Sequence, residues 1–154
     1  MKKILAVIAT ALVMMISGCS MALSENQYYD RFRENYSVYV QRVTSISMKL
    51  MEIEYGSGEC DWDDLDADLK TARDSLDAIE KLSPPPIYSA QHQNLCEEMK
   101  AEKVWCDAVA KVAEDKEMND DNLKGVTDAG NASNFNSVAI RLITQMKRDG
   151  VGTE

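Results

Sequence analysis

The fold is decided by SENQYYDRFRENYSVYVQRVTSISMKLMEI, the stretch of residues 24–53. Its apolar and aromatic residues recur at alternating steps of three and four, which places them on one face of a helix. The first four letters form a capping box, in which Ser24 accepts a hydrogen bond from the backbone and Gln27 reaches back. The sequence therefore predicts a long helix from Ser24 to the turn Gly56-Ser57-Gly58. Its buried stripe is Tyr29, Phe32, Tyr36, Tyr39, Val43, Ile46, Leu50 and Ile53.

Two further stripes with the same spacing follow. The second helix opens with several aspartates, where carboxylates favour the positive end of the helix dipole. It ends at Ser83-Pro84-Pro85-Pro86, because proline lacks an amide proton and disfavours a helical residue before it. In the third stripe Glu102 is the polar misfit. The two stripes are Trp62, Leu65, Leu69, Ala72, Leu76 and Ile79, then Tyr88, His92, Leu95, Met99, Glu102, Cys106, Val109 and Ala113.

A fourth helical stretch follows the polar turn at residues 119–122. The apolar residues in its first part and those in its last part follow two helical patterns that are out of step near Gly130 and Asn131. This change predicts a kink or short loop there. No strand-like alternation and no internal repeat appears. We therefore expect an all-α fold, an up-down-up-down antiparallel four-helix bundle over residues 24–149 with a tail at 150–154. A helical hairpin that pairs with a second copy is the alternative.

The N-terminus, MKKILAVIATALVMMISGCS, has a basic start and a short apolar run, the pattern of a secretory signal. Its end, Ile16-Ser17-Gly18-Cys19, resembles the lipobox of bacterial lipoproteins. The resemblance implies that residues 1–18 form a cleaved signal peptide and that Cys19 carries a diacylglycerol and often a further acyl chain such as palmitate. Residues 19–23 would then be a lipidated tether.

The same resemblance bears on location. It implies an extracytoplasmic, membrane-anchored protein. Ser20 stands where lipoproteins retained in an inner membrane often have aspartate, so we expect the outer membrane if the cell has two membranes and otherwise the cell membrane. The stretch Leu82-Ser83-Pro84-Pro85-Pro86 with Tyr88 and His92 resembles a helix-turn-helix pattern of small bacterial lipoproteins of unassigned function. This resemblance supports a helical bundle and says nothing about activity.

The charge of the chain limits its partners. The whole sequence has a net charge of −9, and residues 1–18 hold two of its 17 basic residues and no acidic one, which leaves −11 for the mature chain. Nucleic acid is excluded, because it requires clustered Lys and Arg. Membrane association is expected to come from the lipid, and an envelope protein is the expected partner.

Three cysteines remain after Cys19, so one disulfide and one free thiol are expected in an exported chain. If the second and third helices run antiparallel about the proline turn, residues whose numbers add up to about 170 lie level. Cys60 is then level with residue 110, about 6 Å along the axis from Cys106. By the same calculation Cys96 is about 21 Å along the axis from the level of Cys60. Only the Cys60–Cys106 pairing therefore approaches the Cα–Cα distance of roughly 4.4–6.8 Å that a disulfide allows. We predict a Cys60–Cys106 disulfide and a free, inert Cys96.

Catalytic and metal-binding motifs are missing from the sequence. His92 is the only histidine, and no nucleophile elbow, phosphate-binding loop or zinc motif occurs. The acidic run from Glu59 to Asp68 fails the spacing of a calcium loop and is expected to be a solvated helix start. Four tyrosines and Phe32 are expected to form core layers, with a ligand cleft between helices as the alternative. The tyrosines are Tyr28, Tyr29, Tyr36 and Tyr39. We therefore expect no cofactor, no metal and no enzymatic activity, but a binding or scaffolding module; the alternative is a bundle that binds a small ligand or a metal.

Overall fold

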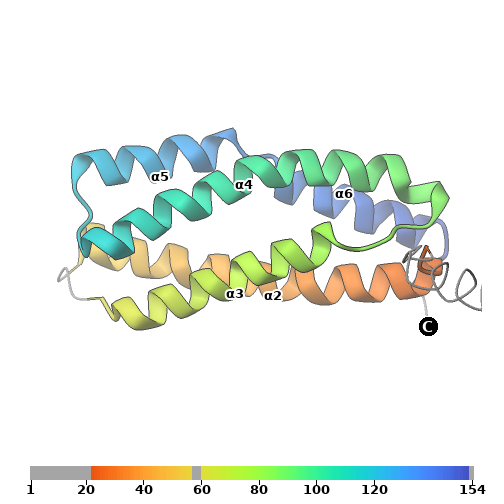
Figure 1. Ribbon diagram of the computed structural model, residues 1–154, viewed down its shortest axis with the longest axis horizontal. Coiled ribbons are helices and arrows are strands. Elements are labelled where there is room, and N and C mark those ends of the chain that lie inside the picture. The colour runs from red at the N-terminus through yellow and green to blue at the C-terminus, as the bar shows by residue number, and fades with distance from the viewer. Residues whose placement is uncertain (1–21, 57–59, 153–154) are drawn as a thin grey trace, which may run out of the picture.

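The computed structural model describes residues 22–56 and 60–152, and every regular element in these two ranges is helical (Figure 1). The expected all-α class is confirmed. The predicted lipobox with Cys19 lies outside the described residues. The elements are α2 (Glu25–Tyr55), α3 (Trp62–Glu80), the short 3₁₀ helix η1 (Pro86–Tyr88), α4 (Ser89–Asp115), α5 (Asp120–Ala132) and α6 (Phe135–Arg148).

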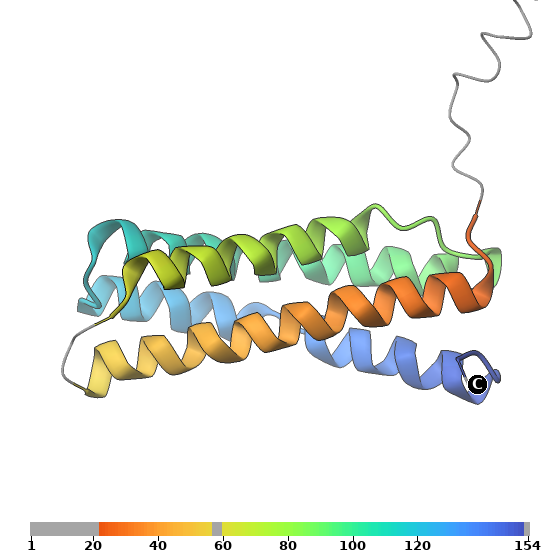
Figure 2. The same cartoon turned by 90° about the horizontal axis from the view of Figure 1, so that it is seen from below.

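α2, α3 and α4 alternate in direction along one axis, and α5 and α6 both run opposite to α4, as Figures 1 and 2 show. α2 packs against α3, and α3 packs against α4. The fourth position of the bundle is shared: α5 packs on α4 in one half of the molecule, and α6 packs on α4 and α2 in the other. The break between them at Ser133 and Asn134 lies two to four residues after the predicted kink.

The start of α2 follows the predicted capping box. Ser24 Oγ accepts from the amide of Gln27 at 3.3 Å, and Gln27 Oε1 accepts from the amide of Ser24 at 3.2 Å. Five members of the predicted stripe are buried and Tyr36, Val43 and Ile53 are partly buried against them. The stripe therefore forms the side of the core that α2 supplies.

We call the end of the bundle where α2 begins the proximal end and the opposite end the distal end. Three segments meet at the proximal end: the amide of Leu23 donates to the carbonyl of Ser83 at 2.9 Å, and the amide of Gly152 donates to Asn26 Oδ1 at 3.2 Å. Val151 is only 4% exposed. Residues 150–152, expected as part of a tail, fold back onto the bundle, so the packed domain extends at least to Gly152.

The register between α3 and α4 differs from the prediction. Arg73 pairs with Asp107 at 2.5 Å and Lys103 pairs with Asp77 at 2.8 Å, so level residues have numbers that add up to about 180. The reason is that the connection after α3 runs on along the bundle, beyond the end of that helix, before α4 turns back (Figure 1). The expected sum of about 170 assumed a reversal at the prolines and is wrong.

Candidate functional site

The predicted disulfide partners carry free thiols in the structure. With the observed register, Cys60 is level with a residue near 120, about 21 Å along the axis from Cys106. Cys106 is fully buried, and burial, aided by Glu102, raises its pKa to about 12. The geometric reason for pairing these two residues is therefore gone.

His92 and Cys96 form a buried polar chain with Tyr28 near the proximal end. The Tyr28 hydroxyl lies 2.9 Å from His92 Nδ1, and Cys96 Sγ lies 3.5 Å from His92 Nε2. Burial lowers the pKa of His92, although a bond to the backbone of Glu80 opposes the shift. Burial also raises the pKa of Cys96, with the charge of Glu80 adding to the effect. A nucleophilic thiol needs a lowered pKa. We therefore interpret His92 and Cys96 as packed structural side chains and not as a catalytic pair.

Glu102, the misfit of the third stripe, is the centre of a second buried network. Tyr39 donates to one of its carboxyl oxygens and Ser133 donates to the other. The Ser133 hydroxyl in turn accepts from the amide of Phe135 at 3.2 Å, so the network reaches the first residue of α6. Burial, followed by the effect of Glu102, raises the pKa of Tyr39 far above its ordinary value. Glu102 thus ties α2 and α4 to the break between α5 and α6.

The acidic run is only partly solvated, because Asp68 is buried between α2 and α3. It accepts from Arg42 at 2.9 Å, Ser45 at 2.6 Å and Lys49 at 2.5 Å. Burial by itself would raise the pKa of Asp68, but these bonds together outweigh it and hold the pKa below its ordinary value. Asp61 caps α3 by accepting from the amide of Asp64 at 3.0 Å. Among the described residues, no group of histidine, cysteine or carboxylate side chains is arranged to hold a metal ion.

The tyrosines near residue 30 pack as core layers. Tyr28, Tyr29 and Tyr39 are at most 1% exposed. The rings of Tyr28 and Phe32 are stacked with centroids 6.1 Å apart, and Tyr39 meets Phe135 edge to face at 5.2 Å. Tyr28, Tyr29 and Tyr39 therefore fill the bundle interior. The partly buried Tyr36 instead lines a shallow surface groove of about 320 Å³ between α2 and α6.

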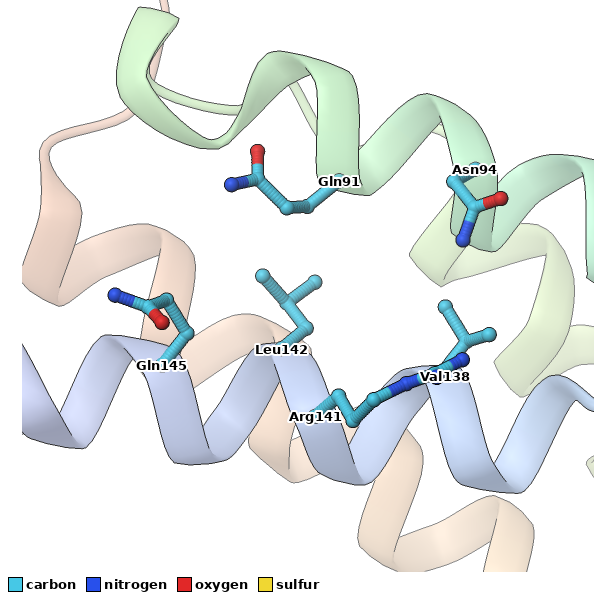
Figure 3. Close-up of a pocket in the computed structure, with 6 residues that line it drawn as sticks. All are labelled: Gln91, Asn94, Val138, Arg141, Leu142 and Gln145. Carbon is cyan, nitrogen blue, oxygen red and sulfur yellow. The ribbon is translucent and has the colours of Figure 1, made fainter.

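A polar cleft of about 360 Å³ lies on the surface between α4 and α6 (Figure 3). Three amide side chains and one guanidinium project from the two helices, and two buried aliphatic side chains from α6 point into the cleft between them. No carboxylate is among the lining residues. They are Gln91, Asn94, Val138, Arg141, Leu142 and Gln145.

An apolar patch lies at the distal end of α2. We use the name distal patch for Met48, Met51 and Tyr55, whose exposed fractions are 53%, 53% and 77%. Steps of three and four place them on one face of the helix. Together with Glu52 and Gly56 they line a shallow groove of about 400 Å³. These are among the most exposed large apolar side chains of the described residues.

No protein-family model, curated protein or solved structure matches the chain. None of the described helices combines the length and hydrophobicity that crossing a bilayer requires. The class that the fold defines is an all-α helical bundle, and its described surface includes the polar cleft between α4 and α6 and the distal patch on α2.

Sequence reasoning missed both surface features. The distal patch has a weak signal, since Met48 and Met51 lie just outside the predicted stripe on a helix whose outer face is mostly polar. The cleft has no sequence signal, because it exists only where α4 and α6 pack together.

Proposed function

We propose that the protein is a lipid-anchored, non-catalytic module of the cell envelope that binds a partner protein through the distal patch. The observation that carries the proposal is the exposure of three large apolar side chains on one face of α2. Clustered apolar exposure of this kind is typical of interaction surfaces, whereas scattered apolar residues are normal. Methionine side chains are flexible and polarisable and suit a contact that adapts to its partner.

The two ends of α2 separate anchoring from binding. The tether would join the bundle at Ser24, and the distal patch lies in the last turns of the same 31-residue helix. At about 1.5 Å per residue the helix is about 46 Å long. The short tether would hold the proximal end close to the bilayer, while the distal patch stands away from it and faces other envelope proteins.

The surroundings of the distal patch indicate the chemistry of the partner. Glu52 lines the groove itself, and the exposed aspartates Asp61 and Asp63 begin the adjoining helix. An apolar surface with an acidic rim is complementary to an amphipathic helix that has basic residues beside its apolar face. We therefore propose such a helix, on an exported protein, as the occupant.

The chemistry of the interior supports a non-catalytic role. The lowered pKa of His92 and the raised pKa values of Cys96 and Cys106 follow from burial in the core. Catalytic groups are instead perturbed within a cleft that a substrate can enter. None of these three residues lines the polar cleft between α4 and α6.

The partner is tested by photo-crosslinking in intact cells. A benzophenone amino acid replaces Met51 in one strain and the exposed Asp74 of α3 in a control strain. We expect a discrete cross-linked product from position 51 that mass spectrometry identifies, and that is lost when Met48 and Tyr55 are changed to glutamine. The same product from both positions, or none from position 51, would contradict the proposed surface.

The anchor is tested separately by replacing Cys19 with serine. The wild-type protein should sediment with membranes, in the outer-membrane fraction of a cell with two membranes, and the variant should be released. If both proteins partition alike, the lipid anchor is wrong even if the distal patch binds its partner.

A further inference from the structure

The walls of the cleft between α4 and α6 have an unusual composition for this chain. The protein has 26 acidic residues and a net charge of −9, yet no acidic residue lines the cleft. The polar lining consists of the amides of Gln91, Asn94 and Gln145 and the guanidinium of Arg141. The Gln145 side chain already donates to both carboxyl oxygens of Asp149, at 2.9 and 3.1 Å, so a ligand that enters the cleft meets the donors of Gln91 and Asn94 and the positive charge of Arg141.

Arg141 is available to a ligand. It takes part in none of the ion pairs among the described residues, whereas Arg73 of α3 and Lys103 of α4 are held by carboxylates. Its helix, α6, also carries Lys147 and Arg148 and contains no acidic residue. A guanidinium presents a planar fork of donors that matches the two oxygens of a carboxylate.

The floor of the cleft narrows the class of anion. Val138 and Leu142 are 6% and 2% exposed, and Figure 3 shows both side chains directed between the two walls. Aliphatic surface of this kind favours an organic anion with a short hydrocarbon part over an inorganic oxyanion, which is hydrated on all sides. The volume of about 360 Å³ is in the lower part of the range for small-molecule sites.

We propose that the cleft between α4 and α6 binds the carboxylate of a small organic ligand. Arg141 holds the carboxylate, and the amides of Gln91 and Asn94 bond to polar atoms beside it. Val138 and Leu142 contact its aliphatic part. This chemistry is shared by a free short-chain acid and by the C-terminus of a peptide. The site is separate from the distal patch and does not depend on the proposed partner.

The test uses nuclear magnetic resonance on the untruncated protein purified from cells in detergent micelles. The side-chain amide signals of Gln91, Asn94 and Gln145 report directly from the walls of the cleft. The probes are butyrate, acetyl-Ala-Ala with a free C-terminus, acetyl-Ala-Ala amide and inorganic phosphate. We expect saturable shifts of these signals with a carboxylate probe and none with the amide or phosphate.

Two variants and one matched control identify the residues responsible. Arg141→Gln should weaken binding by about tenfold or more, because a hydrogen-bonded ionic contact is lost. Asn94→Asp, which adds a negative charge to the wall, should also weaken it. Arg148→Gln makes the same charge change on the same helix outside the cleft and should change affinity less than about twofold, since an exposed charge at a distance is screened.

Several results would overturn the proposal: no saturation with either carboxylate, equal binding of the peptide amide or of phosphate, or equal losses in Arg141→Gln and Arg148→Gln. Tighter binding of acetyl-Ala-Ala than of butyrate would identify a peptide C-terminus as the source of the carboxylate. The reverse order would identify a free acid, and both orders support the carboxylate site.

Discussion

Replacing Tyr39 with phenylalanine removes one oxygen atom from the centre of the bundle. The Tyr39 ring is fully buried and keeps its contact with Phe135, so the change acts on the hydrogen bond to Glu102. Both carboxyl oxygens of Glu102 accept from hydroxyl donors, and no ion pair reaches this buried residue among the described side chains. Loss of a buried hydrogen bond to a charged group costs about 2–3 kcal/mol. For a domain of this size the Tm should fall by roughly 8–12 °C.

The free energy of unfolding is measured by urea denaturation at pH 7, followed by far-UV circular dichroism. Tyr36→Phe is the matched control, because the Tyr36 hydroxyl donates to Asn136 Oδ1 at 3.2 Å in an exposed position and its loss should cost at most about 1 kcal/mol. Adding Glu102→Gln to Tyr39→Phe should cost less than it does in the wild type, since the two residues share one bond. Equal losses in the two tyrosine variants, or strict additivity with Glu102→Gln, would refute the reasoning.

Three further predictions concern other parts of the bundle. The folded protein holds the pKa of Asp68 below its ordinary value of 3.8, so as the pH falls the unfolded chain takes up this proton first, and the stability that Asp68 contributes is present above about pH 4 and is lost at lower pH. Urea midpoints between pH 6 and 3 should therefore fall less steeply in Asp68→Asn, and equal slopes would count against a stabilising role of the bonds that Asp68 accepts. Gly152→Ala should destabilise the fold more than Gly150→Ala, although both glycines have a positive φ. A Cβ at position 152 would lie 2.1 Å from Tyr29 Cε1, whereas a Cβ at position 150 would meet nothing within 4 Å. Similar thermal midpoints of the two variants would contradict this prediction. Gly125 lies within α5, and a Cβ added there would meet nothing within 4 Å. Gly125→Ala should therefore stabilise the protein by about 0.5–1 kcal/mol, and a lower thermal midpoint would show that the glycine has a role beyond the helix.

The helices and most of their buried faces are predictable because the signals are local. The hydrogen bonds between Ser24 and Gln27 join residues three apart. Tyr39 and Ile46 belong to a stripe whose spacing alone specifies a buried face. The change of phase near Gly130 likewise indicates a break, because one straight helix cannot bury both phases.

The register between α3 and α4 is not predictable in this way. The prolines show that α3 ends, but the direction of the following residues depends on contacts that are remote in sequence. Tyr88 donates to Asp149 at 3.0 Å, and the two residues are 61 positions apart. The predicted Cys60–Cys106 pairing depended on that register.

The partners of the buried polar side chains are likewise not predictable from the sequence. Periodicity marks Glu102 as a misfit but does not identify Tyr39 and Ser133, which are 63 and 31 positions away, as its partners. Nothing in the sequence distinguishes Arg141 from an ordinary surface arginine. Its proposed role arises only because Gln91 and Asn94 of another helix lie across the cleft from it.

The proximal end and the distal patch are joined by one uninterrupted helix, α2, and this bears on how the molecule carries mechanical load. A pull between Ser24 and Tyr55 acts along the axis of α2, parallel to its ladder of backbone hydrogen bonds and to its long contact with α3. The tension would stretch these hydrogen bonds along their own direction, so α2 could lengthen only by unwinding, and each unwound turn would also lose its packing on α3. In the proposed arrangement, with the anchor at the proximal end and the partner at the distal patch, the load between the two would pass along this one helix.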